Sequence, residues 1–145
     1  MYVDNILQAK GAVVHTVSAD ARLGDAVKVL NAHNIGAVVV TARNGDVAGM
    51  LSERDVVRQL GKDPTGALLH LVGDCMSTKV ITCSRDTTVA MLMERMTRFR
   101  IRHIPVVEDG ELIGIVSIGD VVKRKIEETE QEATALRDYI ASTIA

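Results

Sequence analysis

The sequence predicts an α/β (α+β) fold in which two β-α-β-β-α repeats pack with pseudo-two-fold symmetry, followed by a C-terminal helix. The main support is a duplicated corner. Gly49 to Asp55 reads Gly-Met-Leu-Ser-Glu-Arg-Asp, and 65 residues later Gly114 to Asp120 reads Gly-Ile-Val-Ser-Ile-Gly-Asp. Each copy resembles an apolar strand that ends at a serine where a helix begins. One such unit covers one face of a small sheet, so two units can bury those faces against each other.

The first repeat is expected to span residues 1–66 and to begin with a strand and a helix. The β-branched segment 13–17 predicts the strand. Asp20 is expected to be the N-cap of the helix, and Gly36 to cap its C-terminal end. Four apolar residues at the spacing of one helical face predict the helix itself: Leu23, Ala26, Val27 and Leu30.

A hairpin and a second helix complete the first repeat. The expected strands 38–40 and 47–51 flank an Asn-Gly dipeptide, which favours the positive φ angles of tight hairpin turns. Ser52 is expected to begin the second helix. The segment 61–66, which contains Gly and Pro, is expected to end the repeat as a loop.

The second repeat, residues 67–126, follows the same order. Val80–Thr82 is its expected first strand and Asp86 the expected N-cap. An Asp-Gly turn joins the hairpin strands 104–107 and 112–116. Its helix carries a stripe with the same spacing as in the first repeat: Val89, Leu92, Met93 and Met96.

Residues 127–145 are expected to form a charged helical tail. Apolar or small residues recur at alternating spacings of three and four, the pattern of a coiled-coil seam: Ile126, Thr129, Ala133, Leu136 and Ile140. The seam is short and includes two weak positions, Thr129 and Ala133. Packing against the protein's own body and pairing with a second chain are both compatible with it.

Composition limits the classes of function. The 145 residues are 47% apolar and 25% charged, as in a globular protein. A net charge of −2 and 2% aromatic residues argue against a nucleic-acid-binding protein. No apolar run approaches a membrane span, and no secretory signal is expected at the N-terminus. Cys75 and Cys83 indicate reduced thiols in a cytoplasmic protein, in preference to a redox pair.

The two corners carry the candidate binding chemistry. A Ser-x-x-Asp sequence at a helix start is typical of a capping box. The same residues suit a polar ligand, because a carboxylate accepts hydrogen bonds from a cis-diol and a helix N-terminus attracts phosphate. Capping and ligand contact are compatible at Ser52 and at Ser117. Neither a nucleophile–base pair nor a metal-ligand spacing is present, so neither an enzyme nor a metal protein is expected.

The tandem repeat, the stretches 34–40 and 101–107, and the two corners resemble a pair of CBS domains. This family is named after cystathionine β-synthase, and such a pair is often called a Bateman module. The resemblance covers roughly residues 3–125. It implies a regulatory module that binds an adenosine-containing ligand between the repeats: AMP, ADP, ATP, NAD(H) or S-adenosylmethionine. It also implies a homodimer and a regulated partner protein that the sequence does not identify.

The resemblance also implies roles for individual residues. The corner Asp would hold the ribose hydroxyls, Ser and nearby basic groups would meet the phosphate, and the base would lie against the first strand of the other repeat. One candidate site comprises Ser52, Arg54, Asp55, Val80, Ile81 and Thr82. The other comprises Val14, His15, Thr16, Ser117 and Asp120, and Arg102 and His103 are candidate phosphate contacts.

The two candidate sites are not expected to be equivalent. Gly119 stands where the first corner has Arg54, and Gly36-Ala37 stand where the second repeat has Arg102-His103. The Asp120 cleft is favoured for phosphate-rich ligands.

Two alternatives remain open. The chain could be a ligand-free structural module for dimerisation or an adaptor, with empty clefts. A local basic run could contact nucleic acid, but Glu94 interrupts it, and a solvated helix face with one or two phosphate anchors is the favoured interpretation. The run comprises Arg95, Arg98, Arg100, Arg102 and His103.

Overall fold

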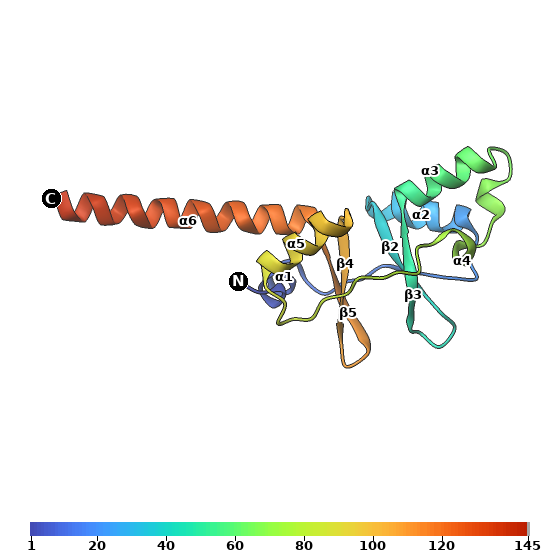
Figure 1. The fold of residues 1–145 in the computed structure, drawn as a ribbon, viewed down its shortest axis with the longest axis horizontal. Coiled ribbons are helices and arrows are strands. Elements are labelled where there is room, and N and C mark those ends of the chain that lie inside the picture. The colour runs from blue at the N-terminus through green and yellow to red at the C-terminus, as the bar shows by residue number, and fades with distance from the viewer. Residues whose placement is uncertain (145) are drawn as a thin grey trace.

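The computed structural model describes residues 1–144, which form two α/β lobes side by side and one long projecting helix (Figure 1). The expected α+β fold of two repeats with a C-terminal helix is confirmed. In chain order the elements are α1 (Val3–Lys10), β1 (Thr16–Ser18), α2 (Leu23–His33), β2 (Ala37–Thr41), β3 (Val47–Ser52), α3 (Glu53–Lys62), the 3₁₀ turn η1 (Ala67–Leu69), α4 (Val72–Cys75), α5 (Val89–Phe99), β4 (His103–Glu108), β5 (Glu111–Ser117) and α6 (Ile118–Ile144).

Each lobe is built on a small sheet with a hairpin. In the first lobe, β1 runs parallel to β2, and β2 runs antiparallel to β3. In the second lobe, β4 and β5 form an antiparallel pair. Both hairpins turn at the expected dipeptides, where Gly45 has φ 87° and Asp109 and Gly110 have φ 50° and 78°.

The strand expected at Val80–Thr82 does not form, and Pro105 provides the reason. Within the described residues, this side of β4 pairs only at Cys83, whose N–H donates to Pro105 O (3.0 Å) and whose carbonyl accepts from the Val107 N–H (2.9 Å). A parallel ladder would next require Ile81 to accept the N–H of residue 105. Proline has no N–H, so the pairing stops after one bridge.

Both expected N-caps are wrong by two residues. The N-cap of α2 is Arg22, whose N–H donates to Asp25 Oδ2 at 3.3 Å, and the carboxylate of Asp20 instead accepts a hydrogen bond from Arg43 Nε at 2.9 Å. The N-cap of α5 is Thr88 and not Asp86. The Thr88 hydroxyl accepts a backbone N–H from the first turn at 3.1 Å, which is the usual role of a capping side chain.

Two further boundaries differ from expectation. The first strand begins at Thr16, so Val13, Val14 and His15 precede it. Helix α2 is capped by Asn34 in the left-handed conformation (φ 53°) and not by Gly36, and Arg100 takes the same conformation after α5 (φ 54°).

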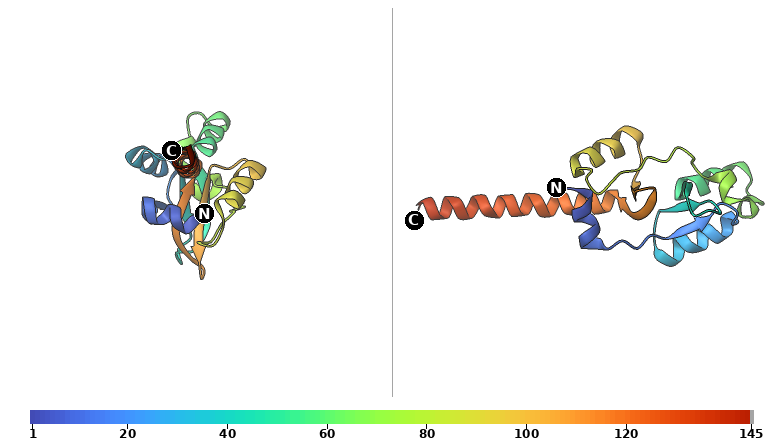
Figure 2. Two further views of the ribbon diagram at one scale, coloured as in Figure 1. Left: turned by 90° about the vertical axis from the view of Figure 1, so that its left-hand side faces the viewer. Right: turned by 90° about the horizontal axis from the view of Figure 1, so that it is seen from below.

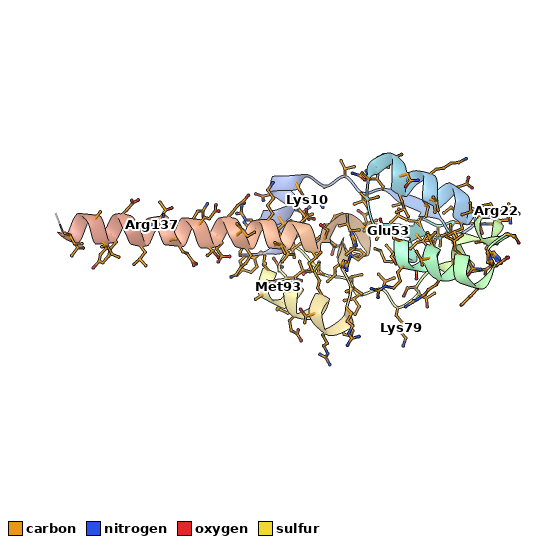
Figure 3. All side chains as sticks on the ribbon, turned by 90° about the horizontal axis from the view of Figure 1, so that it is seen from above. Lys10, Arg22, Glu53, Lys79, Met93 and Arg137 are labelled. Atoms are coloured by element: carbon orange, nitrogen blue, oxygen red, sulfur yellow. The ribbon has the colours of Figure 1, made fainter. Side chains whose placement is uncertain are left out.

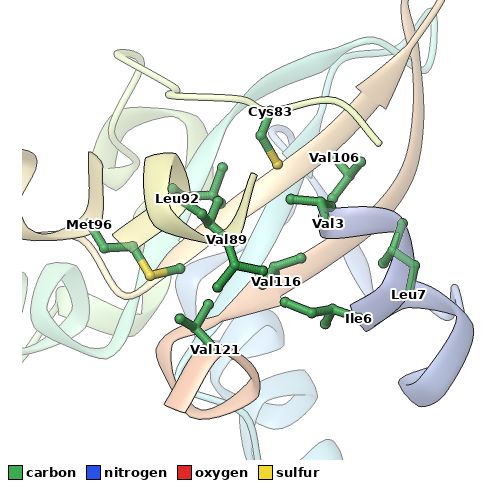
Figure 4. Packing of buried hydrophobic residues seen from close by; sticks show 11 residues of the cluster. Val3, Ile6, Leu7, Cys83, Val89, Leu92, Met96, Val106, Val116 and Val121 are labelled. Carbon is green, nitrogen blue, oxygen red and sulfur yellow. The ribbon is translucent and has the colours of Figure 1, made fainter. Parts of the chain in front are cut away.

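Each lobe's core includes a helix from the other repeat. Val3, Ile6 and Leu7 of α1 pack with the second repeat, as the close view of this core shows (Figure 4). Val72 of α4 packs in the core of the first lobe, against residues such as Leu23. The chain therefore crosses between the lobes, and neither core is complete without the other repeat.

Helix α6 is continuous from the second corner to Ile144, so the corner helix and the tail are one element. It extends away from both lobes, as two further views confirm (Figure 2). The seam residues Ile126 and Leu136 are 52% and 59% exposed. The tail therefore does not pack back against its own body.

The glycine that begins each corner, Gly49 or Gly114, packs against a segment of the other repeat. A Cβ added at Gly49 would lie 2.6 Å from both Met76 Sδ and Ser77 O, and one added at Gly114 would lie 2.6 Å from Leu7 Cδ2. The Ser77 carbonyl is fixed, because it accepts the Met50 N–H at 3.0 Å. The obstruction at Gly114 is instead the end of a flexible side chain.

We expect Gly49→Ala to lower the free energy of unfolding by about 1–3 kcal/mol, the usual cost of overpacking. Gly114→Ala should cost less, because Leu7 can change rotamer. Urea unfolding measures both variants, with Gly61→Ala as the control, since a Cβ there would meet no atom within 4 Å outside its own helix. A loss in Gly114→Ala equal to that in Gly49→Ala would contradict this account.

Candidate functional site

Both serine corners form where a strand runs directly into a helix. At the first corner, the Ser52 N–H and hydroxyl both donate to Asp55 Oδ2, at 2.9 and 3.1 Å. At the second, the Ser117 N–H donates to Asp120 Oδ2 at 2.8 Å, and the Ser117 hydroxyl accepts from the Asp120 N–H at 3.2 Å. The capping arrangement expected from the sequence is present at both corners, and it fixes the direction of both carboxylates.

A cavity of about 620 Å³ lies beside the first corner and is lined by residues of both repeats. This volume is within the range of roughly 300–1,000 Å³ that is usual for small-ligand sites. Thr82 does not line it; its carbonyl accepts a hydrogen bond from Arg95 Nη1 at 3.2 Å. Seven residues proposed from the sequence do line it: Ser52, Arg54, Asp55, Val80, Ile81, Arg102 and His103.

The lining of this first cavity is strongly basic. Five basic side chains stand against the two acids Glu53 and Asp55: Arg54, Arg58, Lys79, Arg100 and Arg102. The Asp55 side chain is only 14% exposed, and its Oδ1 lies 4.0 Å from Arg58 Nη1. Because Ser52 occupies Oδ2, Oδ1 is the oxygen with room for a further donor.

The sequence did not identify Arg58 or Lys79 as site residues. Arg58 lies one helical turn beyond Asp55, a spacing that could have suggested it. Lys79 lies on the linker between α4 and α5 (residues 76–88), and Glu53 lies at the start of α3 (Figure 3). Both line the cavity, and only the folded chain brings them together. Arg100 belongs to the basic run already noted in the sequence.

A second cavity, of about 330 Å³, lies beside the second corner. Of the residues proposed for this site, Ser117 and His15 line it, and His103 lines both cavities. Val14 is half-buried and Thr16 is exposed on β1, and neither lines the cavity.

Asp120 is not among the lining residues of the second cavity, because Lys10 binds it. Lys10 Nζ lies 2.7 Å from Asp120 Oδ2 and also donates to Ile115 O at 2.9 Å. The ammonium therefore occupies a position from which a ribose hydroxyl would donate. This cleft is smaller than the Asp55 cavity and its acid already has an internal partner, and the preference of a phosphate-rich ligand for it stays a prediction.

Lys10 also affects the pKa values of two neighbouring groups, Asp120 and His103. Burial would raise the pKa of Asp120, but the hydrogen bonds from Lys10 and from the Ser117 N–H outweigh it and hold that pKa below its ordinary value. Burial lowers the pKa of His103, and the nearby Lys10 charge adds to this effect. His103 is therefore neutral at pH 7 and can donate one hydrogen bond and accept another.

The two cysteines lie in separate cores. Cys83 packs in the second core, where burial raises the pKa of its thiol to about 11. Cys75 packs against the first core, and burial raises its pKa as well. Both are free thiols that are poorly nucleophilic at neutral pH.

Within residues 1–144, no three His, Cys, Asp or Glu side chains are grouped so that they could hold a metal ion. None of the helices there combines the length and apolar character of a membrane span.

Comparison with known proteins gives a consistent result. The model of the CBS domain family matches this chain twice, at residues 12–62 and 72–127. The CBS domain-containing protein CBSX3, mitochondrial, of Arabidopsis thaliana is 40% identical over 127 residues, which are 85% of this chain and 62% of the plant protein. This chain thus spans slightly less than two thirds of that relative.

Solved structures agree with the sequence matches. A CBS-domain containing protein from Agrobacterium tumefaciens has a TM-score of 0.83 and 44% identity, and the match covers 86% of this chain and 92% of that one. The CBS domain pair of protein MJ0100, in complex with 5′-methylthioadenosine and S-adenosyl-L-methionine, has a TM-score of 0.78 at 23% identity and covers 88% and 98%. At that identity the likeness concerns the fold.

We expect Lys10→Met to raise the pKa of Asp120, because burial still disfavours the carboxylate while the ammonium is gone. A carbon-detected NMR titration of the carboxyl group measures this pKa. Lys28→Met, a lysine on α2 that does not line either cavity, is the matched control and should leave it unchanged.

The same variant has a pH-dependent effect on stability. In the folded protein the pKa of Asp120 lies below the ordinary value of 3.8, so the ionised carboxylate stabilises the fold. This contribution is complete above pH 3.8 and is lost as the pH falls through the pKa of the folded protein. Lys10→Met should therefore be less stable than the parent at pH 6, by up to about 1 kcal/mol. A difference of equal size at pH 2 would contradict this assignment.

Proposed function

We propose a function from one premise: this chain belongs to the CBS domain family and carries two CBS domains in tandem. It is a regulatory module, not an enzyme, and it binds an adenine nucleotide in the cavity beside Asp55. The observation that carries the proposal is the lining of that cavity, which combines a largely buried carboxylate at a helix N-terminus with five basic side chains from both repeats.

Each part of a nucleotide would meet a suitable group. The free Oδ1 of Asp55 would accept a hydrogen bond from a ribose hydroxyl, since Ser52 already occupies Oδ2. Arg54 and Arg102 would pair with phosphate oxygens through charge-assisted hydrogen bonds. The base would lie against the extended linker at Val80 and Ile81, whose backbone has no ladder partner on the β4 side at this point.

The charge of the cavity narrows the ligand class. The related CBS pair of protein MJ0100 was crystallised with 5′-methylthioadenosine and S-adenosyl-L-methionine, both of which contain adenosine. AMP, ADP, ATP and NAD(H) add anionic phosphate, whereas S-adenosylmethionine carries a cationic sulfonium. Five basic residues against two acids favour the phosphate-bearing ligands here.

Regulation would follow from the position of the cavity between the repeats. A ligand that contacts both repeats would shift the equilibrium between two relative arrangements of the repeats. The free energy of that shift can be no larger than the difference between the ligand's binding free energies for the two arrangements. We further propose that the chain acts as a homodimer and controls a separate protein. The cytoplasmic location expected from the cysteines stays a prediction, and the plant relative is named as mitochondrial.

We expect AMP and ATP to bind and Asp55→Asn to weaken AMP by about 1–3 kcal/mol, or roughly 5- to 150-fold. The amide keeps the shape and can still accept the Ser52 N–H, so the variant tests the charge and not the fold. Isothermal titration calorimetry measures the affinity. Asp120→Asn is the control, and it should leave AMP binding in the first cavity unchanged.

Two outcomes would count against this proposal in different ways. If neither AMP, ATP nor NADH binds the parent protein, the ligand-free adaptor alternative replaces nucleotide binding. If AMP binds, and Asp120→Asn weakens it while Asp55→Asn does not, the function stands and the site moves to the second cavity.

Arg102 offers a separate test of phosphate recognition. We expect Arg102→Gln to weaken ATP by about ten-fold while adenosine binding stays unchanged, because only ATP presents phosphate to the guanidinium. Arg98→Gln is the matched control, since Arg98 belongs to the same basic run but does not line the cavity. Equal losses for ATP and adenosine would show that Arg102 does not contact phosphate.

A further inference from the structure

Helix α6 carries an apolar seam that its own lobes leave uncovered. The seam runs along the helix at alternating spacings of four and three and extends the coiled-coil pattern by one residue toward the body: Val122, Ile126, Thr129, Ala133, Leu136 and Ile140. All six residues are exposed. An apolar stripe of this length on an otherwise charged helix calls for a partner.

The seam faces away from the body of its own chain. With Ile126 at heptad position a, Val121 occupies position c and is buried in the second core. Arg124 occupies position f, and its Nε lies 3.2 Å from Met1 Sδ. Position f lies opposite the a/d seam, so α6 uses one side to contact its own lobe and presents the other to solvent.

We propose that two copies of this chain pair through α6 as a parallel, in-register, two-stranded coiled coil. The seam places Ile126 and Ile140 at a positions and Leu136 at a d position, the distribution that favours parallel dimers. Because each body contacts the side of α6 opposite the seam, the two bodies would lie on the outside of the pair.

The flanking charges specify the same orientation. In a parallel pair, a g residue faces the e residue of the next heptad of the partner. Lys125 then faces Glu130 of the partner subunit, and Glu132 faces Arg137 of the partner subunit. By symmetry each pair occurs twice. Within the described residues, Lys125 has an ion pair with Glu128 at 3.8 Å, and Glu130, Glu132 and Arg137 have none.

An antiparallel pair would place like charges together. The antiparallel register that overlaps the whole seam sets Glu130 against Glu130 of the partner subunit and Glu132 against Glu132 of the partner subunit. It also sets Lys123 against Arg137 of the partner subunit. These contacts are repulsive, whereas the parallel arrangement makes four attractive ones.

The pairing is independent of the proposed nucleotide site. No seam residue lines either cavity. Thr129 and Ala133 bury little apolar surface at the centre of the seam, so the flanking ion pairs carry a large share of the orientation preference. Reversing those charges is therefore the sharpest test.

Sedimentation equilibrium of the full chain tests the proposal. Glu132→Arg and Arg137→Glu should each weaken self-association roughly ten-fold, because two attractive pairs become repulsive. An equimolar mixture of the two variants should recover the parental affinity, since the reversed charges then face each other. Asp138→Arg, at an f position with the same change of charge as Glu132→Arg, is the control and should associate like the parent.

A cysteine pair tests the register directly. Under oxidising conditions Ala133→Cys, at an a position, should give a covalent dimer on a non-reducing gel. Gln131→Cys, at an f position, should not. The proposal is overturned if the parent is monomeric at every concentration, if either charge variant associates as well as Asp138→Arg, if the mixture fails to recover, or if both cysteine variants cross-link equally.

Discussion

Val3 and Leu7 are buried in the core of the second lobe although they belong to the first repeat, and Val72 is buried in the core of the first lobe although it belongs to the second repeat. Fully burying such a side chain contributes roughly 1.5–3 kcal/mol. Separating the repeats would expose these residues, so the exchange holds the lobes together. The first cavity is consequently a gap between two anchored bodies, lined on one side by α3 and on the other by the linker and the start of β4.

The crossing segments also make the two clefts different. At both corners the Ser N–H donates to the carboxylate of the Asp three residues later, since this contact depends only on local geometry. Their surroundings come from the segment that crosses each hairpin: Ser77 pairs through its backbone with Met50, whereas the N-terminal segment ends in Lys10, which binds Asp120. Asp55 therefore keeps one carboxylate oxygen available to a ligand, whereas the Asp120 carboxylate forms an internal ion pair with Lys10.

The two proposals concern separate parts of the molecule. The first cavity lies between the lobes, while the seam of α6 runs away from them (Figure 1). Since α6 begins directly after Ser117 and continues unbroken to Ile144, it forms one rigid element from the second corner to the proposed pairing surface. A reorientation of that corner would therefore move the whole helix.

By itself the sequence determined the duplicated corners, the hairpin turns and the helical stripes, because each depends on residue types at short spacings. Seven of the ligand-binding residues that it proposed line one cavity, and their role in binding stays a prediction. Only the tertiary structure decided that Val80–Thr82 forms no strand, because Pro105 lacks the N–H it needs. It alone brought Lys79 into the cavity and Lys10 onto Asp120, since contacts between residues so far apart in the chain depend on how the lobes pack.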